Sequence, residues 1–295
     1  MTGHLRVAPL HPIFGARIDG LDLAAPLPDG LITEIEAAID RFAVLVIPGQ
    51  HLDDHQQFAF ASRFGPIEGA TSGVKQRGNR LAIKEMNDIS NLGEDGNILP
   101  AGDRNRMYAL GNLLWHSDSS FKPAPAKYSM LHARVIPPEG GDTEFADMRA
   151  AWDELPAKMK ETVKDLICDH SIITSRRKVG FDEFTQDELT RGAPSPQRLV
   201  RRHERTGRLS LFLSAHIGGI HGWPVPEALA LINELTEFAT QRKFVYQHTW
   251  SAHDLVIWDN RSTMHRARRF DSHLYPRDLR RVTVRGSRST VDEPL

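Results

Sequence analysis

Residues 113–121 read Leu-Leu-Trp-His-Ser-Asp-Ser-Ser-Phe, in which a single residue separates His116 from Asp118. Side chains repeat every two residues along a β-strand, so this imidazole and this carboxylate are predicted to point to the same side. His265 lies 147 positions after Asp118, at the end of the segment Val-Ile-Trp-Asp-Asn-Arg-Ser-Thr-Met-His over residues 256–265. Two histidines and one carboxylate leave open positions on a metal ion, as in non-haem Fe(II) oxygenases. The two segments together predict a metal site inside a fold that brings them side by side.

The same residues also allow a simpler interpretation. A His-x-Asp pair is common by chance, and alone it more often belongs to a polar surface or a capping turn than to a metal site. Trp115 and Phe121, which flank the pair, favour a buried polar site. His265 alone is a weak signal because the chain has 14 histidines, and His132 in a predicted strand is consistent with an ordinary hydrogen-bonded residue. Only the joint pattern predicts a metal centre.

Composition narrows the class of protein. The 295 residues are 40% hydrophobic and 25% charged, which is enough for a large core. A formal net charge of −1 argues against a nucleic-acid partner. Cys168 is the single cysteine, so neither an internal disulfide nor a cysteine-based metal site is expected. The sequence shows no apolar run typical of a signal peptide or a membrane span, and we expect a cytoplasmic protein without a membrane partner.

Hydrophobic periodicity predicts many short strands interrupted by helices. We expect helices at 32–42, 54–64 (with Asp54 as N-cap), 147–154, 156–167 and 225–242, and strands at 43–47, 128–136, 143–145, 209–214, 244–250, 254–258 and 279–285. Such a pattern with one distant ligand predicts a mostly β fold with helical insertions around a double-stranded β-helix (jelly-roll) core. Residues 1–295 are expected to form one domain.

Three segments are predicted to lack regular structure. Residues 68–110 are polar and rich in glycine and asparagine, and residues 172–197 are basic and end in Pro-Ser-Pro-Gln. Segments of that length are usually functional, so both are expected to be active-site loops. Residues 288–295 are expected to form a loose tail.

A second constellation follows His265. On a strand, Arg277, Leu279, Arg281 and Thr283 would share one face. Two guanidinium groups pointing into a barrel require anionic partners, and the arginine fork suits carboxylates. The alternative is a solvated basic edge strand that resists aggregation. If the arginines do point inward, they imply two ligands that carry carboxylates.

Three groups of residues carry a resemblance to a known family. They are Trp115–Phe121, Pro137–Phe145 with Asp147–Ala151, and Trp258–Arg261 leading to His265. In these the chain resembles the taurine dioxygenase superfamily of Fe(II)/2-oxoglutarate-dependent dioxygenases. The likeness runs from about residue 8 to residue 285 and includes residues 46–50 and 63–66.

The resemblance implies a role for individual residues. His116, Asp118 and His265 match the Fe(II) ligands of the family. Thr143 and Arg277 match the pair that holds the distal carboxylate of 2-oxoglutarate, one as a hydroxyl donor and one as an ion pair.

The resemblance also implies residues for the substrate. Arg281 matches the arginine that receives the acidic head group, and Asn112 matches a position on the substrate side. Lys75 is a weaker match for a second cation. His203 and His216 lie in a segment that resembles the pocket-forming region, although a structural role for both stays open. Trp258 and Asp259 match a motif that packs and holds the strand of His265.

The reaction implied is hydroxylation of the carbon next to the ether oxygen of an aryloxyacetate such as 2,4-dichlorophenoxyacetate. It would give a phenol and glyoxylate, together with succinate and CO2, and would serve herbicide degradation and aromatic catabolism. The implied requirements are Fe(II), 2-oxoglutarate and O2, with ascorbate as reductant in vitro. The expected partner is a small aryl carboxylate, and a homo-oligomer is expected.

Other functions stay open. The same chemistry could act on a taurine-like sulfonate or on a natural aromatic carboxylate, because one arginine accepts either head group. A zinc hydrolase with the same ligands, or a metabolite-binding barrel without catalysis, belongs to a different class. The inward arginines and Thr143 speak against both of these, since neither function needs a dicarboxylate cosubstrate.

Overall fold

The largest sheet is built around two apolar strands. In the computed structural model, which describes residues 5–69 and 80–295, β3 (Val44–Ile47) pairs antiparallel with β13 (Leu255–Asp259), and every residue of both strands is buried. Continuous apolar runs predict strands of this kind. β13 also pairs with β5 (Ala126–Val135), so it lies in the interior of the sheet.

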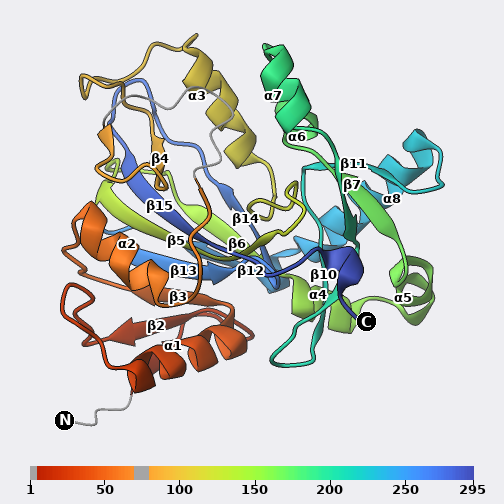
Figure 1. Cartoon of the computed structure of the whole chain (residues 1–295), viewed down its shortest axis with the longest axis horizontal. Helices are drawn as coiled ribbons and strands as arrows, with labels where there is room; N and C mark the ends of the chain where they lie inside the picture. The colour runs from red at the N-terminus through yellow and green to blue at the C-terminus, as the bar shows by residue number, and fades with distance from the viewer. Residues whose placement is uncertain (1–4, 70–79) are drawn as a thin grey trace.

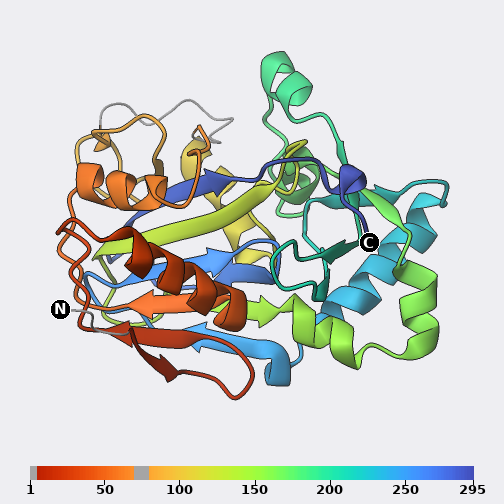
Figure 2. The same ribbon diagram turned by 60° about the horizontal axis from the view of Figure 1, so that its bottom comes forward.

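The sheet has seven strands in the order β1-β2-β3-β13-β5-β15-β4 (Figure 1). The remaining strands are β1 (Arg6–Pro9), β2 (Ala16–Asp19), β4 (Asn87–Ser90) and β15 (Asp278–Arg285). Two helices, α1 (Asp29–Phe42) and α2 (Asp54–Ser62), cover one face (Figure 2). The amphipathic pattern of α1 explains this, because Ile32, Ile35 and Ile39 all enter the core beneath it.

The cap predicted for α2 is wrong by one residue. Asp53 is the N-cap, and it forms a capping box with Gln56. Asp54 is instead the first helical residue, and its carboxylate pairs with Arg134 at 3.1 Å. Both aspartates are compatible with a helix start, so only the capping box identifies the cap.

A second, smaller sheet covers the other face. It contains β12 (Val245–His248), β6 (Thr143–Asp147) and β14 (Thr263–Ala267), in the order β12-β6-β14. Phe145 of this sheet packs with Val256 and Trp258 of the large sheet in one apolar cluster. The two sheets therefore sandwich a common core, and β14 carries His265 along its edge.

The rest of the chain forms two further small sheets with helices beside them. Their strands are β7 (Ile167–His170), β8 (Ser195–Arg198), β9 (Val200–Arg202), β10 (Leu209–Leu211) and β11 (Ile217–Ile220). The helices are α4 (Met148–Glu154), α5 (Ala157–Val163), α8 (Val225–Ala239) and the short 3₁₀ turn η3 (Arg242–Phe244). Most predicted helices and strands are thus present, with ends shifted by a few residues. None of the helices in the described part of the chain is long and apolar enough to cross a membrane.

The segments predicted as loops contain short helices. Segment 68–110 holds β4, α3 (Arg104–Ala109) and the start of η2 (Leu110–Leu113), while segment 172–197 holds α6 (Ile172–Arg177), α7 (Gln186–Arg191) and part of β8. The two segments also contact each other, because Arg104 pairs with Glu188 at 2.8 Å and the rings of Tyr108 and Phe181 meet edge to face.

The C-terminal segment is held rather than loose. Its 3₁₀ turn η4 (Thr290–Asp292) contains the fully buried Thr290, whose hydroxyl donates to Gln197 at 2.6 Å and accepts from the Arg198 amide at 2.8 Å. Glu293 forms an ion pair with Arg201 at 2.7 Å. These polar contacts explain why hydrophobicity alone does not reveal that the tail is attached.

Candidate active site

His116, Asp118 and His265 meet in the structure. One ligand atom from each lies within 4.8 Å of the others, and all three side chains are buried. The Nε2 atoms of His116 and His265 each lie 3.8 Å from a different oxygen of Asp118. Within residues 5–69 and 80–295, this is the group of histidine and acidic side chains that could hold a metal ion.

A turn, and not the predicted strand, brings Asp118 to the two histidines. His116 forms an isolated antiparallel bridge with His265, whose backbone hydrogen bonds measure 3.0 and 2.8 Å. The chain then turns at once, and Ser119 has a φ of 53°. The Ser119 hydroxyl donates to buried Glu68 at 2.6 Å, which holds this turn. Asp118 therefore reaches the two histidines because the backbone turns back.

Neighbouring groups orient both imidazoles. Nδ1 of His116 donates to the Leu114 carbonyl at 2.7 Å, which leaves Nε2 free for a metal. The ring of Trp258 packs against His265 with 4.7 Å between ring centroids. Burial lowers the pKa of His116 and also that of His265, so both rings are neutral and able to ligate near pH 7.

A buried hydrogen-bond network holds Asp118. The Ser129 hydroxyl donates to Asp118 Oδ2 at 2.7 Å and accepts from the Asn260 amide at 3.0 Å. Asn260 Oδ1 in turn accepts from the Asp118 backbone at 3.0 Å and from Trp258 Nε1 at 3.1 Å. The positioning contacts of Asn260 and Ser129 go beyond the packing role predicted for the Trp-Asp-Asn-Arg motif. The motif was a signal for Asn260, whereas Ser129 lies in β5, outside the motif.

Asp118 is also strongly ionised. Burial alone would raise its pKa, but the charge of the Arg281 guanidinium, together with the hydrogen bond from Ser129, holds the pKa below its ordinary value. Arg281 Nη1 donates to Asp118 Oδ1 at 2.5 Å. A charged carboxylate with two neutral imidazoles is a suitable donor set for a divalent transition metal.

We expect Ser129→Ala to weaken Fe(II) or Mn(II) binding by about 10- to 100-fold, because groups that orient metal ligands typically contribute that much. The measurement is metal titration under anaerobic conditions, with thermal unfolding to confirm the fold. Ser262→Ala is the matched control, since Ser262 is equally buried and its hydroxyl has no hydrogen-bond partner in the described chain. Equal affinities for both variants would contradict a positioning role for Ser129.

Arg277 is a buried cation without an anionic partner. It is 7% exposed, its Nη2 donates to the Gly141 carbonyl at 3.1 Å, and its buried Nε has no partner. Among the described residues no carboxylate forms an ion pair with it. Burial lowers the pKa of Arg277 to about 10, so it stays protonated at neutral pH. Such a group has room for an external carboxylate.

Thr143 lies near this cation on β6. Its Oγ1 accepts a hydrogen bond from Trp250 Nε1 at 3.1 Å, which leaves the hydroxyl hydrogen free to donate. Gly141 has a φ of 73°, and a side chain there would meet Arg277 Nε at 3.3 Å. A glycine at this position therefore lets the guanidinium lie close to the backbone.

One cavity of about 480 Å³ joins these groups. It is lined by His116, His265, Thr143, Arg277, Arg281 and Asn112 among others. Apolar side chains form much of the remaining wall, including Met107, Leu110, Leu113 and Phe270. The cavity can thus hold apolar ligands with acidic groups beside the three-ligand cluster.

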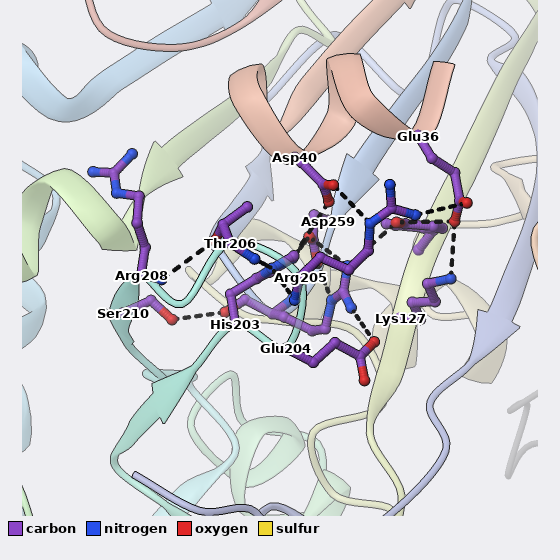
Figure 3. A network of polar contacts seen from close by, with 12 residues as sticks. Glu36, Asp40, Lys127, His203, Glu204, Arg205, Thr206, Arg208, Ser210 and Asp259 are labelled. Atoms are coloured by element: carbon purple, nitrogen blue, oxygen red, sulfur yellow. Dashed lines mark hydrogen bonds and ion pairs between the residues drawn. The ribbon is translucent and has the colours of Figure 1, made fainter. Parts of the chain in front are cut away.

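Two histidines predicted at the substrate are not brought to this cavity. His203 bonds to Asp259 at 3.0 Å and lies in a polar network with Glu36, Asp40 and Arg205 (Figure 3). His216 bonds to the Ser175 hydroxyl at 2.9 Å, and its ring packs edge-on against His116. Neither histidine lines the cavity, because each serves a buried polar contact. Lys75 lies outside the described residues.

The chain matches the family model described as taurine catabolism dioxygenase TauD, TfdA family, over residues 6–283. It is 45% identical over 279 residues to the alpha-ketoglutarate-dependent 2,4-dichlorophenoxyacetate dioxygenase of Burkholderia sp. (strain RASC), covering 95% of this chain and 94% of the relative. It is also 38% identical to the (S)-phenoxypropionate/alpha-ketoglutarate-dioxygenase of Sphingobium herbicidovorans, covering 92% of each chain.

A solved structure agrees closely with the fold. The crystal structure of AAD-2 in complex with Mn(II) and N-oxalylglycine has a TM-score of 0.93 and 48% identity, and the match covers 98% of this chain and 100% of AAD-2. The chain therefore belongs to the TauD/TfdA family of dioxygenases. This confirms the resemblance noted in its sequence, and the chain is an oxidoreductase of that family.

Proposed function

We propose that this chain is an Fe(II)- and 2-oxoglutarate-dependent dioxygenase that hydroxylates the carbon next to the ether oxygen of an aryloxyacetate such as 2,4-dichlorophenoxyacetate. The product of that hydroxylation is a hemiacetal, which collapses to a phenol and glyoxylate. One oxygen atom of O2 enters this product and the other enters succinate, as 2-oxoglutarate loses CO2. One observation carries the proposal: His116 and His265 of the three-ligand cluster line the same cavity as the buried Arg277 and the partly buried Arg281.

His116, Asp118 and His265 would hold Fe(II). Their two imidazole nitrogens and one carboxylate are the donor set that leaves open positions for ligands. Bound iron and 2-oxoglutarate supply the oxidising chemistry toward O2. The protein orients the ligands through Leu114 and Ser129, and it keeps the surroundings buried.

Arg277 and Thr143 would hold the distal carboxylate of 2-oxoglutarate. Arg277 is already desolvated and unpaired, so a carboxylate placed beside it restores the missing charge partner. The free hydroxyl hydrogen of Thr143 would donate to the same carboxylate. These two contacts fix the position of the cosubstrate along the cavity.

Arg281 and Asn112 would orient the aryloxyacetate. Arg281 Nη1 is engaged by Asp118, and the residue lines the cavity, where its guanidinium would meet the substrate carboxylate. Asn112 lies on the wall formed by η2, between Leu110 and Leu113, and these leucines give the aryl ring an apolar surface. Holding the carboxylate at one end would position the adjacent methylene for reaction.

The fold proposed around this site is a double-stranded β-helix formed by the two facing sheets. The cluster in which Phe145 of the small sheet meets Trp258 of the large sheet supports this arrangement. We also propose that residues 1–295 act as one domain, because the ligands and the two arginines come from both sheets and from the turn at Asp118.

Arg281→Ala should raise the KM for the aryl acid by about tenfold or more, the effect of losing a charged hydrogen bond of ~1.5 kcal/mol. The KM for 2-oxoglutarate should change much less. Metal affinity should fall as well, because Asp118 loses its ion pair. Steady-state kinetics with each substrate varied in turn measures the two KM values. Arg268→Ala is the control, because Arg268 lines the same cavity and its side chain is half-exposed. A larger effect on 2-oxoglutarate would overturn the assignment.

The proposed reaction is tested by succinate release with Fe(II), 2-oxoglutarate and ascorbate. Phenoxyacetates, phenylpropanoid acids and taurine-like sulfonates are compared, and the phenol is measured separately. Succinate and phenol in equal amounts from a phenoxyacetate support the proposal. If succinate is released only with a sulfonate, the substrate is a sulfonate and the aryloxyacetate proposal is rejected. The absence of succinate with every acid would reject the dioxygenase and favour a zinc hydrolase or a binding protein.

A further inference from the structure

A second pocket of about 750 Å³ lies apart from the candidate active site and shares none of its lining residues. We call it the second pocket. Its walls come from β9 and the turn after it, from the end of β15 with residues 286–288, and from the C-terminal segment at Glu293 and Pro294. Residues 64–66 and 125–127 complete it.

The second pocket is strongly cationic. Its lining contains two acidic residues, Glu204 and Glu293, and six basic ones. This local excess of positive charge contrasts with the net charge of −1 of the whole chain. The basic side chains in the lining are Lys127, Arg201, Arg202, Arg261, Arg285 and Arg288. A concave surface with one sign of charge attracts ions of the opposite sign.

Both acidic residues are already engaged. Glu293 pairs with Arg201 at 2.7 Å, and Glu204 pairs with Arg261 at 2.8 Å. Arg261 is further neutralised by Asp259, whose Oδ1 lies 2.9 Å from Arg261 Nε. The excess positive charge is therefore not balanced from within the pocket.

Three arginines of the lining lack a carboxylate. Arg202, Arg285 and Arg288 form no ion pair in the described part of the chain, and Arg202 donates only to the Gly207 carbonyl at 2.9 Å. They come from β9, from β15 and from the segment after β15. Different parts of the chain thus bring unpaired guanidinium groups to one concave surface.

Arg201 is the buried arginine of the lining that Glu293 engages. It is 7% exposed and lies over the Phe212 ring, with 4.8 Å from Cζ to the ring centroid. Its Nε and Nη2 donate to Glu293, but its buried Nη1 has no hydrogen-bond partner. The charge of Arg201 is therefore balanced by Glu293, and Arg201 does not count among the unpaired arginines of the pocket.

We propose that the second pocket binds a small polyanion that carries two or more phosphate or carboxylate groups. The planar fork of arginine matches both groups, and each forms charge-assisted hydrogen bonds with it. The pocket is larger than a single phosphate requires, and its unpaired arginines come from separate chain segments. A ligand with several acidic groups can therefore engage more than one arginine at once.

The test is thermal unfolding and calorimetric titration of the full chain with pyrophosphate and with citrate, at low ionic strength and without added metal. Sodium chloride at matched ionic strength is the reference. The Arg277→Met variant serves as background, because it removes the unpaired arginine of the active site, while Arg281 is engaged by Asp118. We expect saturable binding and a rise in Tm with at least one polyanion, both retained in this background.

Arg202→Gln combined with Arg288→Gln should weaken that binding at least tenfold. The matched control is Arg177→Gln with Arg191→Gln, which removes two exposed arginines from α6 and α7 and changes the net charge equally. A preference for pyrophosphate or citrate identifies the acidic group of the ligand. The proposal is overturned if sodium chloride gives the same rise in Tm, if the double variant keeps its affinity, or if binding disappears in the Arg277→Met background.

Discussion

Asp118→Ala is expected to abolish Fe(II) binding and turnover. The variant loses the one anionic member of the three-ligand cluster, and the two neutral imidazoles are left without it. It also leaves the partly buried Arg281 without its ion pair, since Asp118 Oδ1 accepts from Arg281 at 2.5 Å. An unpaired guanidinium beside the site repels a divalent cation, so both effects act in the same direction.

Metal affinity is measured by anaerobic titration with Mn(II) or Fe(II), and turnover by succinate release. Asp118→Asn separates shape from charge, because the amide keeps the size of the side chain and removes its negative charge. Asp254→Asn is a matched control: Asp254 is also buried, but it contacts His248 and the Ser251 amide outside the cluster. Near-normal metal affinity in Asp118→Ala would refute the assignment of the ligands.

Arg277→Ala is expected to raise the KM for 2-oxoglutarate by about 10- to 150-fold, which corresponds to a charged hydrogen bond of roughly 1.5–3 kcal/mol. The KM for the aryl acid should change little. The lysine variant should restore only part of the affinity, because an ammonium group lacks the planar fork. Kinetics with each substrate varied separately measures the difference.

The same substitution should have an unusual effect on stability. In the ligand-free protein Arg277 is buried, hydrogen-bonded only to Gly141, and without a carboxylate. Arg277→Met, which fills a similar volume without charge, should therefore not lower the Tm of the free protein. It should instead remove the rise in Tm that 2-oxoglutarate produces in the presence of metal. A lower Tm with an unchanged response to 2-oxoglutarate would mean that Arg277 is structural.

The sequence predicts the parts of this structure in which local pattern and tertiary structure agree. β3 and β13 are continuous apolar runs, and α1 has a clear helical stripe, so their burial follows from hydrophobicity alone. The ligand cluster was also predictable, because residues far apart in the chain formed one chemically consistent set.

Other features of the structure depend on tertiary contacts, which the amino-acid sequence alone does not reveal. The six-residue helices α3, α6 and α7 are too short for a periodic signal. His203 finds its partner Asp259 only through folding, so its sequence context resembled that of a site residue. The prediction that Asp118 lies beside His116 is confirmed, but the predicted cause, alternation of side chains along a strand, is wrong. A turn at Ser119 brings the Asp118 carboxylate to the two histidines.

Because of the bridge between His116 and His265, metal binding is coupled to the folding of the chain. These segments meet only after the chain has folded, so the metal site does not exist in the unfolded protein. An ion that binds only the folded state lowers the ratio of unfolded to folded chains by a factor of one plus its free concentration divided by its Kd. Degradation that proceeds through unfolded chains then slows as well. Metal binding would therefore protect the folded chain from proteolysis in addition to enabling its activity.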